Sequence, residues 1–188
     1  ILCSRLGLSF YRRKILPAKD INEYGKWVIV TGCTSGIGKE FVEHFAKKNM
    51  NILLISRNET KLELQKKYLI DKYHIDVKYI TFDYTKIGKE RHDFYENLKT
   101  KCIDMNNRGG IGILVNNVGI SNEIPMNLDE FSEMELTDIL QCNINSTVFM
   151  TRTVYTYMKE RSNGAIICIS SGSGNHPTPM LSVYSATK

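Results

Sequence analysis

The eight residues T-G-C-T-S-G-I-G, at positions 31–38, decide how this chain folds. They follow W-V-I-V-T, a short apolar and β-branched run that predicts a buried strand, and they precede a segment with helical periodicity. Gly32 permits a tight turn, and Gly36 and Gly38 let backbone approach a ligand or a neighbouring strand closely. Because the free N–H groups at the start of the helix face such a turn, the stretch predicts a binding site for a phosphate-bearing ligand.

The same alternation of strand and helix continues along the chain. We expect strands at 27–31, 51–56, 77–82, 111–115 and 165–170, and helices at 36–49, 59–73, 88–105, 140–160 and from 183 onward. Strands alternating with helices of this length predict an α/β fold of the Rossmann type, a doubly wound parallel sheet that ends at the fifth strand. Ligands of such sheets bind beyond the carboxyl ends of the strands.

Composition narrows the class of protein. The chain has 188 residues, of which 42% are hydrophobic and 24% charged, as in one ordinary globular domain. A net charge of +5 suits an anionic ligand or membrane surface, but it is too small to indicate nucleic acid. The five cysteines have no metal-binding spacing, so we expect reduced thiols facing the cytosol, no disulfide framework and no metal site.

Residues 1–25 are expected to form a membrane-proximal or linker segment ahead of a nucleotide-binding domain at 26–188. The opening stretch, I-L-C-S-R-L-G-L-S-F-Y-R-R-K, changes from apolar to basic. It is compatible with the cytoplasmic flank of a membrane anchor and equally with an ordinary helix start. No window reaches the roughly 18 apolar residues of a membrane span.

Polar residues at the strand ends predict which dinucleotide binds. The hydroxyls of Thr34 and Ser35 can contact its phosphates. An NAD site usually has an acidic residue after the second strand, whereas this chain has S-R-N there, and Arg57 can pair with a 2′-phosphate. The sequence therefore favours NADP(H), with Lys39 as a second candidate partner for that phosphate.

The third and fourth strands end in F-D-Y-T and N-N-V-G. The Asp83 carboxylate can accept a hydrogen bond from an adenine amino group, side-chain amides can tie strands together, and Gly119 lets backbone pass close to a ribose. The predicted cofactor-binding residues are Gly32, Thr34, Ser35, Gly36, Ile37, Gly38, Arg57, Asp83, Asn116, Asn117 and Gly119, together with Tyr184 and Lys188 introduced below.

A tyrosine four residues before a lysine is a candidate catalytic pair, because the two side chains share one face of a helix. The chain contains four such pairs: Tyr68/Lys72, Tyr95/Lys99, Tyr155/Lys159 and Tyr184/Lys188. Tyr184 alone has a serine 13 positions earlier, Ser171, which also follows the fifth strand. We expect Tyr155 instead to pack in the core, within an apolar stripe of the 140–160 helix formed by Leu140, Ile144, Val148, Thr151, Tyr155 and Met158.

These residue types suit carbonyl reduction. Hydride transfer to a ketone leaves an alkoxide that needs a proton, which Tyr184 can supply. The ammonium group of Lys188 favours the phenolate form of Tyr184 and can also hold ribose hydroxyls of the nicotinamide. The Ser171 hydroxyl can donate to the substrate oxygen as its negative charge develops.

T-G-C-T-S-G-I-G, N-N-V-G, S-S-G-S-G and Y-S-A-T-K, in this order and spacing, resemble the classical short-chain dehydrogenase/reductase family from about Lys26 to Lys188. The resemblance implies a fourth catalytic residue, an asparagine that holds a relay water. It corresponds to Asn143, while the nearby Asn145 is expected to be a polar helix neighbour.

The valine of N-N-V-G and the G-S-G after the serines are similar to one branch of the family, which holds the very-long-chain 3-oxoacyl-CoA reductases and the 17β-hydroxysteroid dehydrogenases of types 3 and 12. That similarity implies NADPH, a lipophilic acyl-CoA or steroid carbonyl as substrate, and the endoplasmic reticulum membrane as location with the catalytic domain in the cytosol. Two alternative functions stay open: a non-catalytic NADP(H)-binding protein and a reductase of another carbonyl such as a retinoid or sugar. A homodimer also stays open.

The family's sequences continue beyond the position that corresponds to Lys188. We therefore expect residues 1–188 to be a fragment whose fifth strand, 165–170, is left as an apolar unpaired edge. Expressed alone, this fragment is expected to be poorly soluble and inactive.

Overall fold

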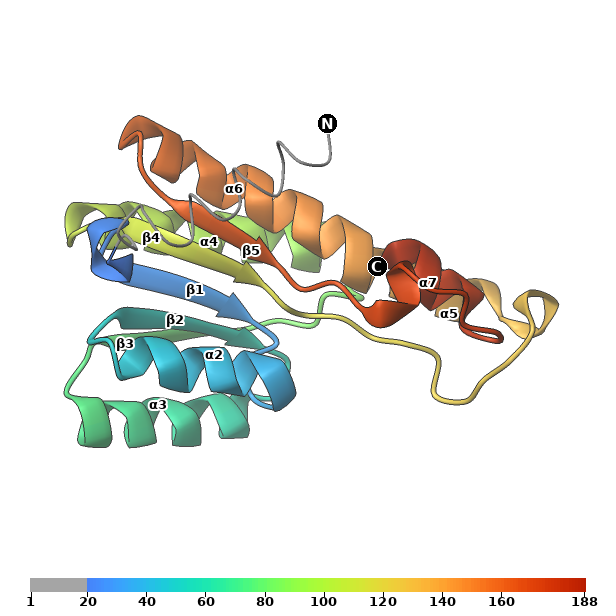
Figure 1. Cartoon of the computed structure of the whole chain (residues 1–188). Coiled ribbons are helices and arrows are strands. Elements are labelled where there is room, and N and C mark those ends of the chain that lie inside the picture. The colour runs from blue at the N-terminus through green and yellow to red at the C-terminus, as the bar shows by residue number, and fades with distance from the viewer. Residues whose placement is uncertain (1–19) are drawn as a thin grey trace, which may run out of the picture.

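A computed structural model describes residues 20–188, which form a five-stranded parallel sheet in the order β3-β2-β1-β4-β5 (Figure 1). The strands are β1 (Trp27–Thr31), β2 (Asn51–Ser56), β3 (Val77–Thr81), β4 (Ile111–Asn116) and β5 (Ala165–Cys168). The predicted fold class is confirmed, and the main difference is that β5 ends two residues early. Chain order reverses between β1 and β4, and this is the point where open α/β sheets bind ligands.

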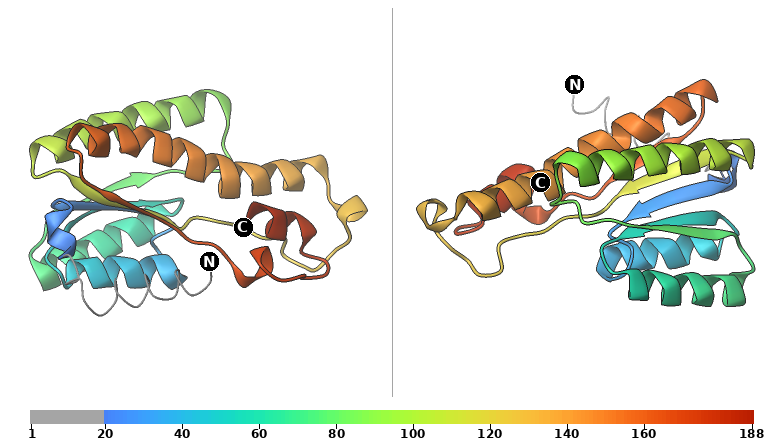
Figure 2. Two further views of the ribbon diagram at one scale, coloured as in Figure 1. Left: turned by 45° about the horizontal axis from the view of Figure 1, so that its top comes forward. Right: turned by 180° about the vertical axis from the view of Figure 1, so that it is seen from behind.

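Helices cover both faces of the sheet. They are α2 (Gly36–Ala46), α3 (Glu59–Tyr73), α4 (Gly88–Asn107), α5 (Glu133–Leu140), α6 (Ser146–Glu160) and α7 (Ser182–Thr187). Figure 1 shows α2 and α3 on one face and α4 and α6 on the other, matching two separate buried clusters of side chains. Both views of Figure 2 show α5 and α7 beyond the carboxyl ends of the strands.

The central strands are buried on both faces, so their sequences are continuous apolar runs rather than alternating ones. Burying these side chains on two sides provides most of the driving force for folding. In the described part of the chain β5 is one of the sheet's two edge strands, with β3 at the other edge, and it is only half-buried, in agreement with the expected edge strand.

The predicted helix at 140–160 is longer and less regular than expected. It is preceded by α5, which we did not predict, although Ser132 and Glu135 form a capping box that marks its start. Between α5 and α6 lies one π-helical turn, η3 (Gln141–Asn145). Such single π turns occur often at functional sites.

Most of the apolar stripe expected to face the core does not. Val148 is 54% and Tyr155 53% exposed, and Leu140 and Ile144 are exposed as well. Met158 of that stripe is buried as expected, and the other large apolar side chains of α6 in the core are Met150 and Val154, which the stripe did not include. The helix carries apolar residues on two sides, and the π turn changes the phase between its halves, so spacing alone selected the wrong side. Core packing therefore does not explain Tyr155.

The described part of the expected N-terminal segment packs against the domain. One helical turn, η1 (Ile21–Glu23), is capped by Asp20. Arg161 donates to the Tyr24 carbonyl over 3.2 Å, and the Asn163 side chain donates to the Glu23 carbonyl over 2.6 Å. The anchor hypothesis concerns residues 1–14, which lie outside the described residues. From residue 20 onward, no helix combines the length and apolar character that crossing a membrane requires.

Candidate active site

The turn after β1 is held to the end of β4 by a compact set of hydrogen bonds. The Thr31 hydroxyl donates to the Val115 carbonyl over 3.2 Å and accepts from the backbone N–H groups of Asn117 and Val118, each at 3.0 Å. The Asn117 amide donates to the carbonyls of Thr31 and Gly32 over 2.9 and 3.0 Å. Asn117 therefore has the strand-tying role that the sequence predicted for it.

The glycines of this turn serve different purposes. Gly32 has a φ of +62°, a left-handed conformation that glycine adopts without strain. At Gly38 the constraint is space, since a Cβ atom would overlap the Gly32 carbonyl oxygen and lie 2.5 Å from the Asn117 amide nitrogen. Gly36 has no atom within 4 Å of a Cβ position, so the space there is open.

A cleft of about 390 Å³ lies at the carboxyl ends of β1 to β4. Among its lining residues are seven of those predicted to bind the cofactor: Gly32, Thr34, Ser35, Arg57, Asp83, Asn117 and Gly119. Gly36, Ile37, Gly38, Asn116, Tyr184 and Lys188 do not line it. Asn116 is buried, and its side chain donates to Thr151 over 2.9 Å and to the Cys168 sulfur over 3.7 Å, which links β4 to α6 and β5.

One end of the cleft is cationic. Arg57 lies there as predicted, and the second cation is Lys61, on the first turn of α3, rather than Lys39. Asn58 accepts from the Lys61 backbone N–H over 2.9 Å and so caps this helix. Sequence reasoning missed Lys61. Its place on the first turn of the helix that follows β2 could have indicated a second cation near Arg57.

The cleft also contains polar groups beside Asp83. The Asp83 carboxylate accepts from the backbone and hydroxyl of Thr85, at 3.0 and 2.9 Å, which fixes its orientation. The adjacent Tyr84 is 5% exposed, and its hydroxyl has no hydrogen-bond partner among residues 20–188. Burial raises the pKa of Tyr84 well above its usual value, so the hydroxyl is a neutral donor. The Tyr84 ring packs among the core rings of Phe82 and Phe94, and its hydroxyl has almost no accessible surface on the cleft.

The thiols near the cleft are unreactive. Burial raises the pKa of Cys142, which lines the cleft, to about 11, and that of Cys33, in the glycine turn, to about 12. Neutral thiols are poor nucleophiles and poor metal ligands. No group of three potential metal-ligating side chains occurs within the described residues.

Asn143 links the loop after β4, which lines the cleft, to α7. It sits in η3, is 4% exposed, and its amide oxygen accepts from the Ile120 N–H over 2.8 Å. Its amide nitrogen donates to the Ile120 carbonyl and to the Thr187 hydroxyl, both at 2.8 Å. The side chain thus fixes the loop after β4 to α7, immediately before Lys188. Asn145 donates to Gln141 over 2.8 Å, as expected of a helix neighbour.

Lys188 lies against the loop that follows β4. Its Nζ donates to the Ile169 carbonyl over 3.3 Å and is 5.9 Å from the centre of the Tyr184 ring. A Cβ atom on Gly119 would lie only 2.8 Å from this nitrogen and 3.3 Å from the Asn143 amide oxygen. The absence of a side chain at Gly119 therefore lets Lys188, Asn143 and the loop meet.

Ser171 lies on the turn that packs against α7. Its hydroxyl accepts from the Ser173 N–H over 3.2 Å and caps η4 (Gly172–Gly174). Since the oxygen is the acceptor in that bond, the hydroxyl proton is left to donate to another group. The neighbouring Ser170 donates to the Lys188 carbonyl over 2.8 Å, which ties β5 to the end of α7.

The other three tyrosine–lysine pairs lie elsewhere. Lys72 donates directly to the Tyr68 hydroxyl on the exposed face of α3, a surface contact with no cleft beside it. Tyr95/Lys99 and Tyr155/Lys159 belong to α4 and α6. Only the Tyr184/Lys188 pair adjoins Asn143 and Gly119, so the geometry agrees with the choice made from the spacing to Ser171.

Comparison with known proteins places this arrangement in a family. The family model described as short chain dehydrogenase matches residues 26–188. The human protein named inactive hydroxysteroid dehydrogenase-like protein 1 is 40% identical over 186 residues, covering 98% of this chain and 54% of that protein. The bovine very-long-chain 3-oxoacyl-CoA reductase is 41% identical over 166 residues, covering 87% of this chain and 50% of that protein. The chain spans about half the length of these relatives.

Solved structures of other proteins have a similar fold. L-sorbose reductase from Gluconobacter frateurii, complexed with NADPH and L-sorbose, has a TM-score of 0.77 at 25% identity, over 90% of this chain and 61% of that one. A short-chain dehydrogenase from Sphingobium yanoikuyae in complex with NADPH has a TM-score of 0.75 at 24% identity, over 86% of this chain and 59% of that one. Sheet order, glycine turn and family match lead to one conclusion: the chain belongs to the short-chain dehydrogenase family.

Proposed function

We propose that the protein containing this chain uses NADPH to reduce a carbonyl group to a secondary alcohol. The observation that carries the proposal is the meeting of Lys188 and Asn143 at Gly119, which connects the nucleotide cleft to the Tyr184 helix. The cleft's fit to a dinucleotide is supported by the glycine turn and by the Arg57 and Lys61 cations.

Each reacting side chain has a physical role. NADPH, when bound, would supply the hydride. The Tyr184 hydroxyl delivers the proton to the forming alkoxide, and the nearby Lys188 ammonium stabilises the phenolate that remains. The free proton of the Ser171 hydroxyl donates to the carbonyl oxygen and stabilises its developing charge. Asn143 positions the loop and α7; that it also holds a relay water stays a prediction.

For the substrate we propose a 3-oxoacyl-CoA, with a 17-ketosteroid as the alternative. The support is the bovine relative, whose name is very-long-chain 3-oxoacyl-CoA reductase, together with the motif resemblance described above. From the same resemblance we propose association with the endoplasmic reticulum membrane and leave a homodimer open. Recovery of the full-length protein in a soluble fraction, rather than with microsomal membranes, would contradict the proposed location.

A second function, NADP(H) binding without catalysis, is favoured by the human relative whose name includes "inactive". Purified full-length protein with NADPH and a 3-oxoacyl-CoA distinguishes the two: carbonyl reduction predicts substrate-dependent loss of NADPH absorbance. If the protein binds NADPH but does not oxidise it in the presence of 3-oxoacyl-CoA, ketosteroid or retinal substrates, the result would support the non-catalytic function and contradict the proposed carbonyl reduction.

The proposed preference for NADPH over NADH can be tested at Arg57. Arg57→Ala should lower kcat/KM for NADPH by about tenfold to a hundredfold, because a hydrogen-bonded charge pair to the 2′-phosphate is lost. The value for NADH, which lacks this phosphate, should change little. Lys67→Ala, an exposed charge removal on α3 outside the cleft, is the matched control. Equal losses for both cofactors would show that Arg57 does not read the phosphate.

A further inference from the structure

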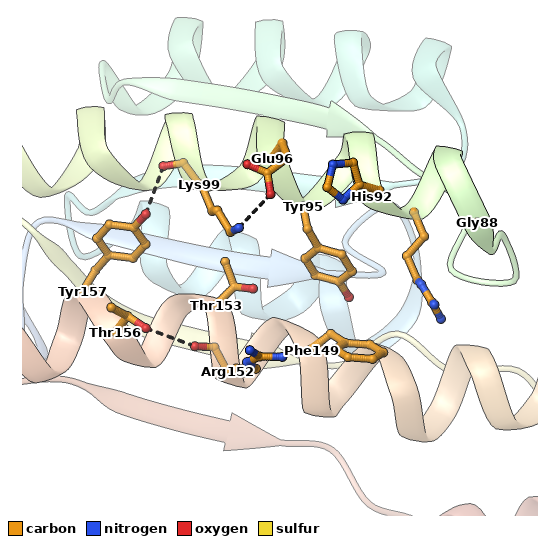
Figure 3. A pocket seen from close by; sticks show the side chains of 11 residues that line it. Gly88, His92, Tyr95, Glu96, Lys99, Phe149, Arg152, Thr153, Thr156 and Tyr157 are labelled. Atoms are coloured by element: carbon orange, nitrogen blue, oxygen red, sulfur yellow. Dashed lines mark hydrogen bonds and ion pairs between the residues drawn. The ribbon is translucent and has the colours of Figure 1, made fainter.

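A second cavity, of about 480 Å³, lies between α4 and α6 on the side of these helices that faces away from the sheet (Figure 3). Its lining includes three half-buried aromatic rings, those of Tyr95, Phe149 and Tyr157. No residue of the nucleotide cleft lines it. Its volume is within the range of small-molecule sites. We call this cavity the α4–α6 groove.

The charge of the groove is predominantly positive. Arg91, Lys99 and Arg152 line it, and Glu96 is the one carboxylate among its lining residues. Glu96 is already paired with Lys99 at 2.7 Å. Arg91 donates to Gln141 over 3.2 Å and lies 5.2 Å from the centre of the Phe149 ring.

Arg152 differs from these two cations. Neither an ion pair nor a side-chain hydrogen bond within residues 20–188 engages its guanidinium group, which lies beside Phe149 in Figure 3. Arg152 is exposed, so its guanidinium group is free to pair with an anion that binds in the groove.

Aromatic rings and hydroxyl groups from both helices line the groove. Figure 3 shows Tyr157 and Tyr95 on either side of Thr153, with Lys99 above them on α4. The Tyr157 hydroxyl donates to the Lys99 carbonyl over 3.4 Å, and the rings of Tyr95 and Phe149 are 5.8 Å apart, so the aromatic walls are held by the helices themselves. Threonine hydroxyls offer hydrogen bonds between those walls.

We propose that the α4–α6 groove binds a nucleoside monophosphate, with the base against the aromatic rings, sugar hydroxyls on the threonines and the phosphate on Arg152. Stacking on aromatic rings accepts any base, whereas guanidinium groups select for phosphate. The site is separate from the nucleotide cleft and from the reduction proposed above.

Photolabelling of the full-length protein with 8-azido-AMP, followed by mass mapping of the labelled peptides, tests this proposal. The label is expected on peptides of α4 and α6, and a saturating concentration of NADPH should not displace it. Arg152→Glu should weaken labelling by about tenfold or more, because a charge-assisted contact becomes a repulsive one. Glu96→Gln should strengthen it, since it removes the groove's carboxylate.

Lys159→Glu is the matched control, because it makes the same charge reversal on α6 outside the groove. Labelling with 8-azidoadenosine, which lacks the phosphate, should be far weaker, and circular dichroism checks that each variant folds. Label confined to residues 31–61, labelling unchanged by Arg152→Glu, or an Arg152→Glu effect on self-association with no nucleotide bound would each overturn the proposal.

Discussion

Replacing Tyr184 with phenylalanine in the full-length protein should lower kcat for carbonyl reduction by about 10²–10⁴-fold, the usual contribution of a positioned proton donor. Phenylalanine keeps the ring beside Lys188, at 5.9 Å from its Nζ, but removes the hydroxyl. Because Tyr184 does not line the nucleotide cleft, the Kd for NADPH should stay nearly constant. Steady-state kinetics and fluorescence titration of NADPH measure the two quantities.

Tyr155→Phe is the matched control for this variant. Tyr155 also stands four residues before a lysine, but it is 53% exposed on α6. It belongs neither to the cleft lining nor to the group formed by Tyr184, Asn143 and Lys188. Loss of the Tyr155 hydroxyl should leave kcat unchanged. Retained turnover in Tyr184→Phe, or an equal loss in both variants, would assign the proton donor to another group.

Replacing Gly38 with alanine should disrupt the glycine turn more than any other single methyl group added there. The new Cβ would overlap the Gly32 carbonyl oxygen and approach the Asn117 amide nitrogen to 2.5 Å, and both groups belong to the hydrogen-bonded join between β1 and β4. Overpacking against backbone costs about 1–3 kcal/mol. We expect that loss in the free energy of unfolding, and at least tenfold weaker NADPH binding.

Gly172→Ala supplies the comparison for stability. Its Cβ position has no atom within 4 Å, and its φ is not in the left-handed region, so unfolding by urea should be nearly unchanged. If Gly38→Ala unfolds at the same urea concentration as the unchanged protein, the turn relaxes in a way that the observed contacts do not predict.

Sequence alone was sufficient for the sheet and for several polar residues that line the cleft, because strand ends in a parallel sheet share one edge and the polar residues there are local in the chain. Arg57, Asp83 and Asn117 were found in this way. Lys61 was missed because it lies inside the next helix, outside the strand ends at which Arg57 and Asp83 were found.

Features that depend on distant packing could not be predicted. Periodicity identified a helix around α6 but not which of its two apolar sides meets the sheet, so Tyr155 was placed in the core wrongly. Likewise, Asn143 was identified by resemblance, whereas its bonds to Ile120 and Thr187 join segments 23 and 44 residues away. No local pattern encodes such contacts.

The strand order also bears on how the chain folds as it is synthesised. β1 pairs with β2, which follows soon after it, and with β4, which begins about 80 residues later. At the usual pace of ~5–20 residues per second, one edge of β1 would wait on the order of 4–16 s for its partner. During that interval the most buried strand of the finished domain presents unpaired backbone and apolar side chains. A nascent chain of this kind is a natural client for ribosome-associated chaperones.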